Sequence, residues 1–187
     1  MACLKLALAL ACVSAATPVA AGVMVVGSSH GRPCYEAARD RLSTEGALTV
    51  CDEALRSDFL SRHDVVATYV NRGIVKLWSN DHQGAIADFD EAIRRNPDQP
   101  EAYLNKGSTF LRMKGDSQEA VRLFSESLNR GTDFPALAHY GRAIAHEVGG
   151  NLQAAYRDYR RAQQLSPRWE EPRRELARFK VVSRSNL

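Results

Sequence analysis

A pattern of small and apolar residues returns three times along the middle of the chain. Gly73, Gly107 and Gly141 stand at equal intervals, within the similar segments TYVNRG, AYLNKG and AHYGRA. Glycine inside a helix costs about 1 kcal/mol unless close packing requires it, so we expect an alanine of a neighbouring helix to face each one. A regular period of this kind restricts the fold to stacked copies of one supersecondary unit.

A second pattern follows each glycine and marks the partner helix of the unit. An aromatic residue stands at Phe89, Phe124 and Tyr159, with an alanine four residues earlier and a small residue three residues later. Positions i, i+4 and i+7 lie on one stripe of an α-helix, which indicates a buried face. Each unit is therefore predicted to be two amphipathic helices joined by a short turn.

This arrangement resembles the tetratricopeptide repeat (TPR) family, in which an aromatic residue, a glycine, an Ala-x-x-x-Phe pattern and a closing proline recur with a fixed period. Residues 66–99 match the pattern most closely and end it with Pro97. Residues 100–133 lack the closing proline, and residues 134–167 carry it at Pro167. The resemblance implies an all-α helical solenoid of antiparallel helix pairs.

Two flanking segments complete the predicted solenoid. Residues 33–65 contain a degenerate first repeat, with PCYEAARDRL as its first helix and GALTVCDEALR as its second. Residues 168–187 supply a C-terminal capping helix and tail, and this helix is predicted over 166–180 with Ser166 as its N-cap. A solenoid needs such a cap because its last repeat would otherwise expose an apolar face.

The N-terminus has the pattern of a cleaved signal peptide. Residues 1–21 carry one early charge, an apolar run too short to cross a bilayer, and small residues before Gly22. We therefore expect a periplasmic or secreted protein, cleaved near Ala21, with residues 22–32 as a flexible leader. A lipoprotein anchored through Cys12 is the alternative, although the expected leucine three residues before it is missing.

Cys51 stands in the column that the other repeats fill with an aromatic ring. After export, Cys34 and Cys51 are the two cysteines that remain. They lie nearly level on antiparallel helices, and an oxidising compartment favours a bridge between them. We predict a disulfide that replaces the aromatic packing; two reduced, buried cysteines are the alternative.

No motif in the sequence indicates catalysis, a metal or a cofactor. A glycine-rich phosphate loop, a Gly-x-Ser-x-Gly turn and a His-Glu-x-x-His helix are all missing, and the five histidines are scattered. Acidic pairs such as Asp88 and Asp90 point in different directions on a helix and are interpreted as surface charges. An enzyme is therefore the third interpretation, behind two kinds of binding protein.

The segment from Arg157 to Arg184 is basic, with nine basic and four acidic residues. Such a segment can contact nucleic acid, anionic lipid head groups or only solvent. Export argues against nucleic acid. A membrane-apposed adaptor, held by this basic cap or by a lipid, is thus the alternative to a free interaction module.

The resemblance also implies where a partner binds. In the family, the first helices of successive repeats line a concave groove that holds a protein or peptide segment. The matching positions are Asn71, Ile74 and Trp78; Asn105, Ser108 and Arg112; and His139, Arg142 and His146. An asparagine amide can hydrogen-bond an extended backbone, so the predicted function is noncatalytic partner binding in this groove. The alternative is that the asparagines only follow the repeat pattern.

Intact mass of the exported chain tests the predicted processing. We expect a mature protein that begins at or near Gly22 and carries no lipid, because small residues precede Gly22. A mass that retains residues 1–21, or a diacylglycerol adduct on Cys12, would contradict the prediction.

Overall fold

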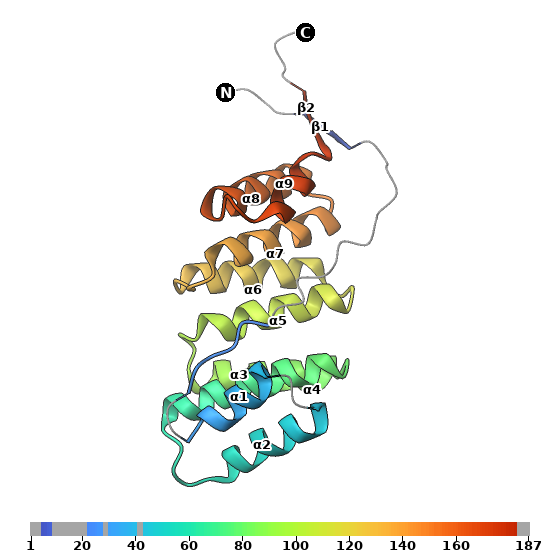
Figure 1. Cartoon of the computed structure of the whole chain (residues 1–187). Helices are drawn as coiled ribbons and strands as arrows, with labels where there is room; N and C mark the ends of the chain where they lie inside the picture. Colours follow the sequence, from blue (N-terminus) through green and yellow to red (C-terminus); the bar gives the residue numbers. More distant parts are fainter. Residues whose placement is uncertain (1–4, 9–21, 28–29, 41–42, 183–187) are drawn as a thin grey trace.

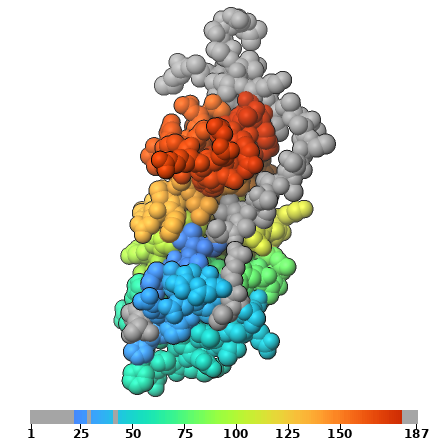
Figure 2. Space-filling view, viewed as in Figure 1, coloured from blue at the N-terminus to red at the C-terminus, as the bar shows by residue number. Residues whose placement is uncertain are grey.

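A computed structural model describes residues 5–8, 22–27, 30–40 and 43–182 of the 187-residue chain (Figure 1). The helices of the described part are α1 (Arg32–Arg39), α2 (Thr44–Arg56), α3 (Arg62–Trp78), α4 (His82–Arg95), α5 (Pro100–Arg112), α6 (Ser117–Asn129), α7 (Pro135–Val148), α8 (Leu152–Leu165) and α9 (Glu170–Leu176). They stack in sequence order into one elongated body (Figure 2). This helical solenoid confirms the predicted fold class.

A short antiparallel ribbon joins the two ends of the described chain. Strand β1 (Lys5–Leu8) pairs with strand β2 (Phe179–Val182), so that Lys5 lies opposite Val182. Strand β1 falls within the predicted signal peptide, and the remainder of that peptide and its cleavage site at Ala21 lie outside the described residues. Within the described part, no helix has the length and apolar character needed to cross a membrane.

Each complete repeat turns between its helices in the same way. One residue adopts the left-handed backbone conformation, and a short polar residue then caps the second helix by accepting a hydrogen bond from a backbone N–H. The left-handed residues are Asn80, Lys114 and Gly150. The capping residues are Asp81, Asp116 and Asn151. The turns therefore provide a fixed point from which the register of each first helix can be counted.

This register corrects the glycine column. Gly73 and Gly107 each stand seven residues before the left-handed residue of their turn, and Ala143 holds that place in the third repeat. Gly141 stands two residues earlier, so its equal spacing from Gly107 does not reflect structural equivalence. It faces backward instead, where a Cβ would overlap the ring of Phe124 in the preceding repeat.

The aromatic column forms the centre of the solenoid. Phe89, Phe124 and Tyr159 are each at most 1% exposed. A Cβ on Gly73 would lie only 2.6 Å from Cε1 of Phe89, so the glycine lets the ring approach the backbone of the first helix. The sequence predicted an alanine at this contact, and that partner was wrong.

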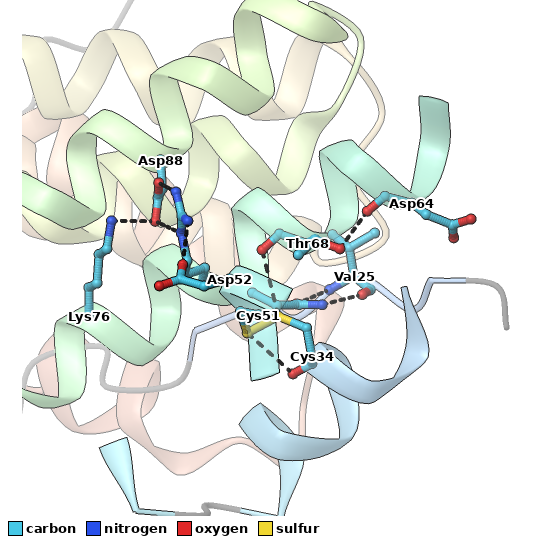
Figure 3. The surroundings of a disulfide bond; sticks show 10 residues. Val25, Cys34, Cys51, Asp52, Asp64, Thr68, Lys76 and Asp88 are labelled. Atoms are coloured by element: carbon cyan, nitrogen blue, oxygen red, sulfur yellow. Dashed lines mark hydrogen bonds and ion pairs between the residues drawn. A yellow bond between two sulfur atoms is a disulfide. The ribbon is translucent and has the colours of Figure 1, made fainter. Parts of the chain in front are cut away.

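Cys51 continues the buried column into the first, degenerate repeat. A disulfide joins it to Cys34, as predicted, with the Cα atoms 4.5 Å apart and both residues fully buried (Figure 3). The sulfur of Cys34 lies 3.8 Å from the carbonyl oxygen of Thr68 on α3. The bridge therefore fastens α1 to α2 while resting against the next repeat.

The C-terminal cap is shorter than the helix predicted over 166–180. Helix α9 begins at Glu170, and Ser166 ends α8 instead of capping α9. The intervening Trp169 packs on Tyr140 with ring centroids 4.7 Å apart. Aromatic rings outside α9 thus share the task of covering the last repeat.

Removing the disulfide tests its contribution to the fold. We expect the double variant Cys34→Ala/Cys51→Ala to lose about 3 kcal/mol of unfolding free energy, because the bridge closes a loop with a sequence separation of 17 residues. Urea unfolding with and without reductant measures the loss. Reductant should weaken the wild type by a similar amount and leave the double variant unchanged; equal stability of both proteins without reductant would contradict the prediction.

Candidate interaction face

The chain's own residues 22–27 lie on the face that the sequence predicted to bind a partner. They form an extended segment that crosses α5 and runs toward α1 (Figure 1, blue). Val23 is 5% exposed, whereas Val26 is 57% exposed. The sequence predicted a flexible leader over residues 22–32, and it gave no indication of this docking.

Two asparagine amides hold the backbone of this segment. Asn105 accepts a hydrogen bond from the N–H of Val23 and donates one to its carbonyl oxygen, both at 2.9 Å. Asn71 pairs in the same way with Val25, accepting at 3.0 Å and donating at 2.7 Å. Each amide therefore pairs with the backbone of one residue, and the two paired residues are two positions apart in an extended chain. We call the surface of α3 and α5 around Asn71 and Asn105 the asparagine face.

Burial makes this pairing important for the chain. Asn71 is 0% exposed and Asn105 is 1% exposed, so neither amide has water as an alternative partner. A buried polar group left without a hydrogen bond costs about 1 to 3 kcal/mol. Residues 22–27 thus satisfy amides that an empty face would have to hydrate.

Side chains of the segment fit the surface beside the two amides. A Cβ on Gly22 would lie 2.7 Å from Cγ2 of Ile74, so the face accepts only a very small residue at this point. Met24 and Trp78 both pack against the hydrophobic cluster of the first complete repeat. Two further predicted binding residues, Ile74 and Trp78, therefore lie at the docked segment.

The other two predicted residues of α5 have different surroundings. The hydroxyl group of Ser108 donates a hydrogen bond to the carbonyl oxygen of Leu104 within α5, and Ser108 is buried. Arg112 is half-buried and makes no ion pair with any described residue, and its Nε has no hydrogen-bond partner there. Of the predicted set, Arg112 is thus the positively charged residue that has no acidic partner among the described residues.

The three predicted residues of α7 do not join the asparagine face. Their side chains converge instead on Asp158 of α8. The distances to its carboxylate are 2.8 Å from Nδ1 of His139, 2.8 Å from Nε of Arg142 and 3.9 Å from Nε2 of His146. The register explains this placement, since Gly141 stands where the earlier repeats carry Asn71 and Asn105.

Arg142 belongs to a partly buried bridge that the sequence reasoning missed. It pairs with Asp158 of its own repeat, while its guanidinium also donates to Ser125 of the preceding repeat at 3.0 Å. Its counterpart in the first complete repeat, Arg72, follows the same plan. Arg72 pairs with Asp88 of its own repeat and with Asp52 of the preceding repeat, each at 2.6 Å (Figure 3).

Asp88 is therefore a structural carboxylate and not the surface charge that the sequence analysis assigned. It is 3% exposed and also contacts Lys76 at 2.8 Å. On α5, Lys106 pairs with Asp90 at 2.6 Å. These pairs neutralise the positive charges of the first helices close to their own backbone, which leaves the asparagine face largely neutral.

The basic cap is compensated only in part: Arg157, Arg160, Arg161 and Arg168 make no ion pair with a described residue, whereas the later arginines do. Each arginine of its final helical turns pairs with a glutamate three residues earlier. The pairs are Arg173 with Glu170, Arg174 with Glu171 and Arg178 with Glu175. Within α9 itself the glutamates Glu170, Glu171 and Glu175 outnumber the two arginines, so the charge excess of the segment comes from the residues around this helix.

A family model described as Tetratricopeptide repeat matches residues 70–134 and 113–168. The chain belongs to the tetratricopeptide repeat family. The human Tetratricopeptide repeat protein 13 is 38% identical over 66 residues, which are 35% of this chain and 8% of that protein. The match thus covers less than a tenth of the relative's length.

Solved structures share the fold at low sequence identity. MamA (residues 41 to the end) from Desulfovibrio magneticus RS-1 has a TM-score of 0.65 at 19% identity, covering 81% of this chain and 84% of that one. The first TPR domain of Spaghetti (RPAP3), bound to the HSP90 peptide SRMEEVD, has a TM-score of 0.58 at 20% identity. That match covers 60% of this chain and 88% of the other.

The charge cluster of the third repeat predicts a loss of stability in acid. Burial opposes ionisation of Asp158, but hydrogen bonds from Arg142 and His139 outweigh it and hold the pKa of Asp158 at about 2, below the ordinary 3.8. The folded pKa lies below the unfolded one, so the ionised carboxylate stabilises the fold above about pH 4 and this stabilisation is lost as the pH falls through about 2.

We expect Asp158→Asn to lower the unfolding free energy by at least about 2 kcal/mol at pH 7 and by progressively less between about pH 4 and pH 2. Urea unfolding at pH 7, 4 and 3 measures both effects. Asp133→Asn is the matched control, because Asp133 is exposed and makes no ion pair with a described residue. An equal loss at every pH would contradict the role assigned to the carboxylate.

Proposed function

We propose that this protein is a noncatalytic interaction module that holds an extended segment of a partner protein on its asparagine face. The observation that carries the proposal is the paired hydrogen bonding of Asn71 and Asn105 with alternate backbone residues. Such pairing recognises an extended chain independently of most of its side chains. A surface that already binds one such segment has the chemistry to bind another.

The family supports this reading. TPR folds generally serve as noncatalytic interaction modules, and the RPAP3 domain with the same fold holds a peptide of HSP90. In the described part of this chain, no group of three or more histidine, cysteine or acidic residues is placed to hold a metal ion. The partner of this chain is therefore proposed to be a protein or peptide segment.

We also propose that the protein works in the periplasm or outside the cell. The signal-peptide pattern of residues 1–21 supports this location, and so does the disulfide, because structural disulfides persist mainly in oxidising compartments. Cleavage near Ala21 would remove β1 and leave β2 without its partner strand. The alternative is an adaptor at the membrane surface. It would rely on Arg157, Arg160, Arg161 and Arg168, which make no ion pair with a described residue, because the two arginines of α9 are paired with glutamates.

Site-specific photocrosslinking tests the binding face. A photoreactive phenylalanine replaces Arg112, which is half-buried at the end of α5 and free of ion pairs with described residues. The matched control carries the same group at Arg122, whose side chain is 55% exposed on α6. Illumination with a periplasmic extract of the source organism should give partner adducts at position 112 and not at position 122. Adducts at position 122 alone would place the binding surface elsewhere.

A further inference from the structure

We propose that residues 22–27 are a built-in ligand of the asparagine face, and that its partner is a neutral, extended, glycine-containing apolar segment that displaces them. This inference rests on the proposed function and specifies its partner. The segment lies outside the helical repeats. It binds the asparagine face through hydrogen bonds to Asn71 and Asn105 and through the buried side chain of Val23.

The docked segment defines the pattern that the face accepts. One amide pairs with residue 23 and the other with residue 25, so the backbone must be extended between them. Position 22 must be very small because Ile74 lies where a Cβ would point. Position 23 is apolar and buried, whereas position 26 faces solvent. A partner with a small residue followed by three apolar residues would reproduce these contacts, because Val23, Met24 and Val25 all pack against apolar clusters.

The charges on the first helices further restrict which partner segments the face can bind. The positive side chains on the first helices that could attract an acidic segment are already paired with carboxylates. These pairs are Arg72 with Asp52 and Asp88, Lys76 with Asp88, Lys106 with Asp90, and Arg142 with Asp158. An acidic partner would bring negative charge close to the carboxylates of these pairs, and Arg112 is the residue of the predicted set that makes no ion pair with a described residue. The face therefore favours a neutral segment.

Attachment to the same chain gives residues 22–27 an advantage over any free segment. A short tether produces an effective concentration in the millimolar range, so a free partner competes with a high local concentration of the built-in ligand. The tether leads into α1, which the disulfide fixes on α2. Removing both asparagine amides weakens binding of the tethered segment and of a free partner alike. The effect of these two substitutions on partner affinity is therefore measured in a variant whose tethered segment is undocked.

Peptide titration of the full chain tests the proposal. The probes are GVMVVG, the sequence of residues 22–27, and GVMEEG, each carrying a fluorophore on a polar linker. The proteins are the wild type, Val23→Asp, Val23→Asp/Asn71→Ala/Asn105→Ala, and the control Val23→Asp/Asn129→Ala. The aspartate introduced by Val23→Asp places a charge in a buried position and undocks the segment, while Asn129 is exposed at the end of α6.

We expect Val23→Asp to bind GVMVVG at least about tenfold more tightly than the wild type, because the competing segment has left. The two asparagine substitutions should abolish that gain, and Asn129→Ala should preserve it. GVMEEG should bind Val23→Asp at least about tenfold more weakly than GVMVVG. Equal binding by the wild type and Val23→Asp, or a gain that survives loss of both asparagines, would overturn the built-in ligand.

A second variant and a second measurement protect the test against unfolding. Gly22→Val introduces side-chain atoms against Ile74 and should give the same gain while leaving position 23 intact. Hydrogen exchange should show protected amides at residues 23 and 25 in the wild type, and fast exchange in both undocked variants. Exchange at the random-coil rate in the wild type would also overturn the proposal.

The test separates this inference from the proposed function. Partner adducts at position 112 together with failed peptide arms would remove the built-in ligand and leave the interaction face in place. Loss of those adducts while GVMVVG still binds would remove the proposed partner function and leave the self-docking intact. Tighter binding of GVMEEG than of GVMVVG would overturn the neutral chemistry and assign the face to acidic segments.

Discussion

The solenoid depends on a buried column of aromatic rings. Each phenylalanine ring of the column packs against a glycine of a first helix. Phe89 approaches the backbone of α3 because Gly73 has no side chain, and Phe124 approaches both α5 and α7 at Gly107 and Gly141. These contacts fix how closely successive helices stack. The first repeat lacks a ring, and the Cys34–Cys51 bridge fills the same column with a covalent bond. Ring packing and the disulfide thus stabilise the same position of the repeat in different copies of it.

The partly buried arginine–aspartate pairs link successive repeats at specific positions. Arg72 and Arg142 each join the second helix of their own repeat to that of the preceding one. A buried ion pair is poor evidence for net stability, because desolvation offsets much of the attraction. Its effect here is on register and charge: it fixes which residues face inward and leaves the neighbouring asparagine face neutral.

The fold was largely predictable from the sequence because a buried stripe tolerates few residue types. The aromatic column and the level placement of Cys34 and Cys51 carried enough information for the repeats and the bridge. The asparagines were identified correctly as residues able to pair with an extended backbone, yet the sequence did not reveal that their ligand is nearby in the same chain. No short pattern separates a docked extended segment from a free one.

The error in α7 has a specific cause. Gly141 preserves the even spacing of the glycines by coincidence, because α7 gains two residues between this glycine and its turn. Counting back from Gly150 and the capping Asn151 would have placed Ala143 in the column and turned Arg142 inward. Turn chemistry was therefore the better guide to register than the most conspicuous repeated residue.

The replacement of an amide by Gly141 gives the asparagine face a polarity. The docked chain enters at the second complete repeat and leaves at the first, so its N-terminal end points toward the repeat that offers no amide. Any segment bound through the same two amides inherits that orientation. Its downstream end therefore points toward α1 and its upstream end toward α7, where Gly141 offers no amide. Reversing the direction of a bound chain would therefore require a different set of backbone partners, so the face discriminates between the two directions of an extended segment.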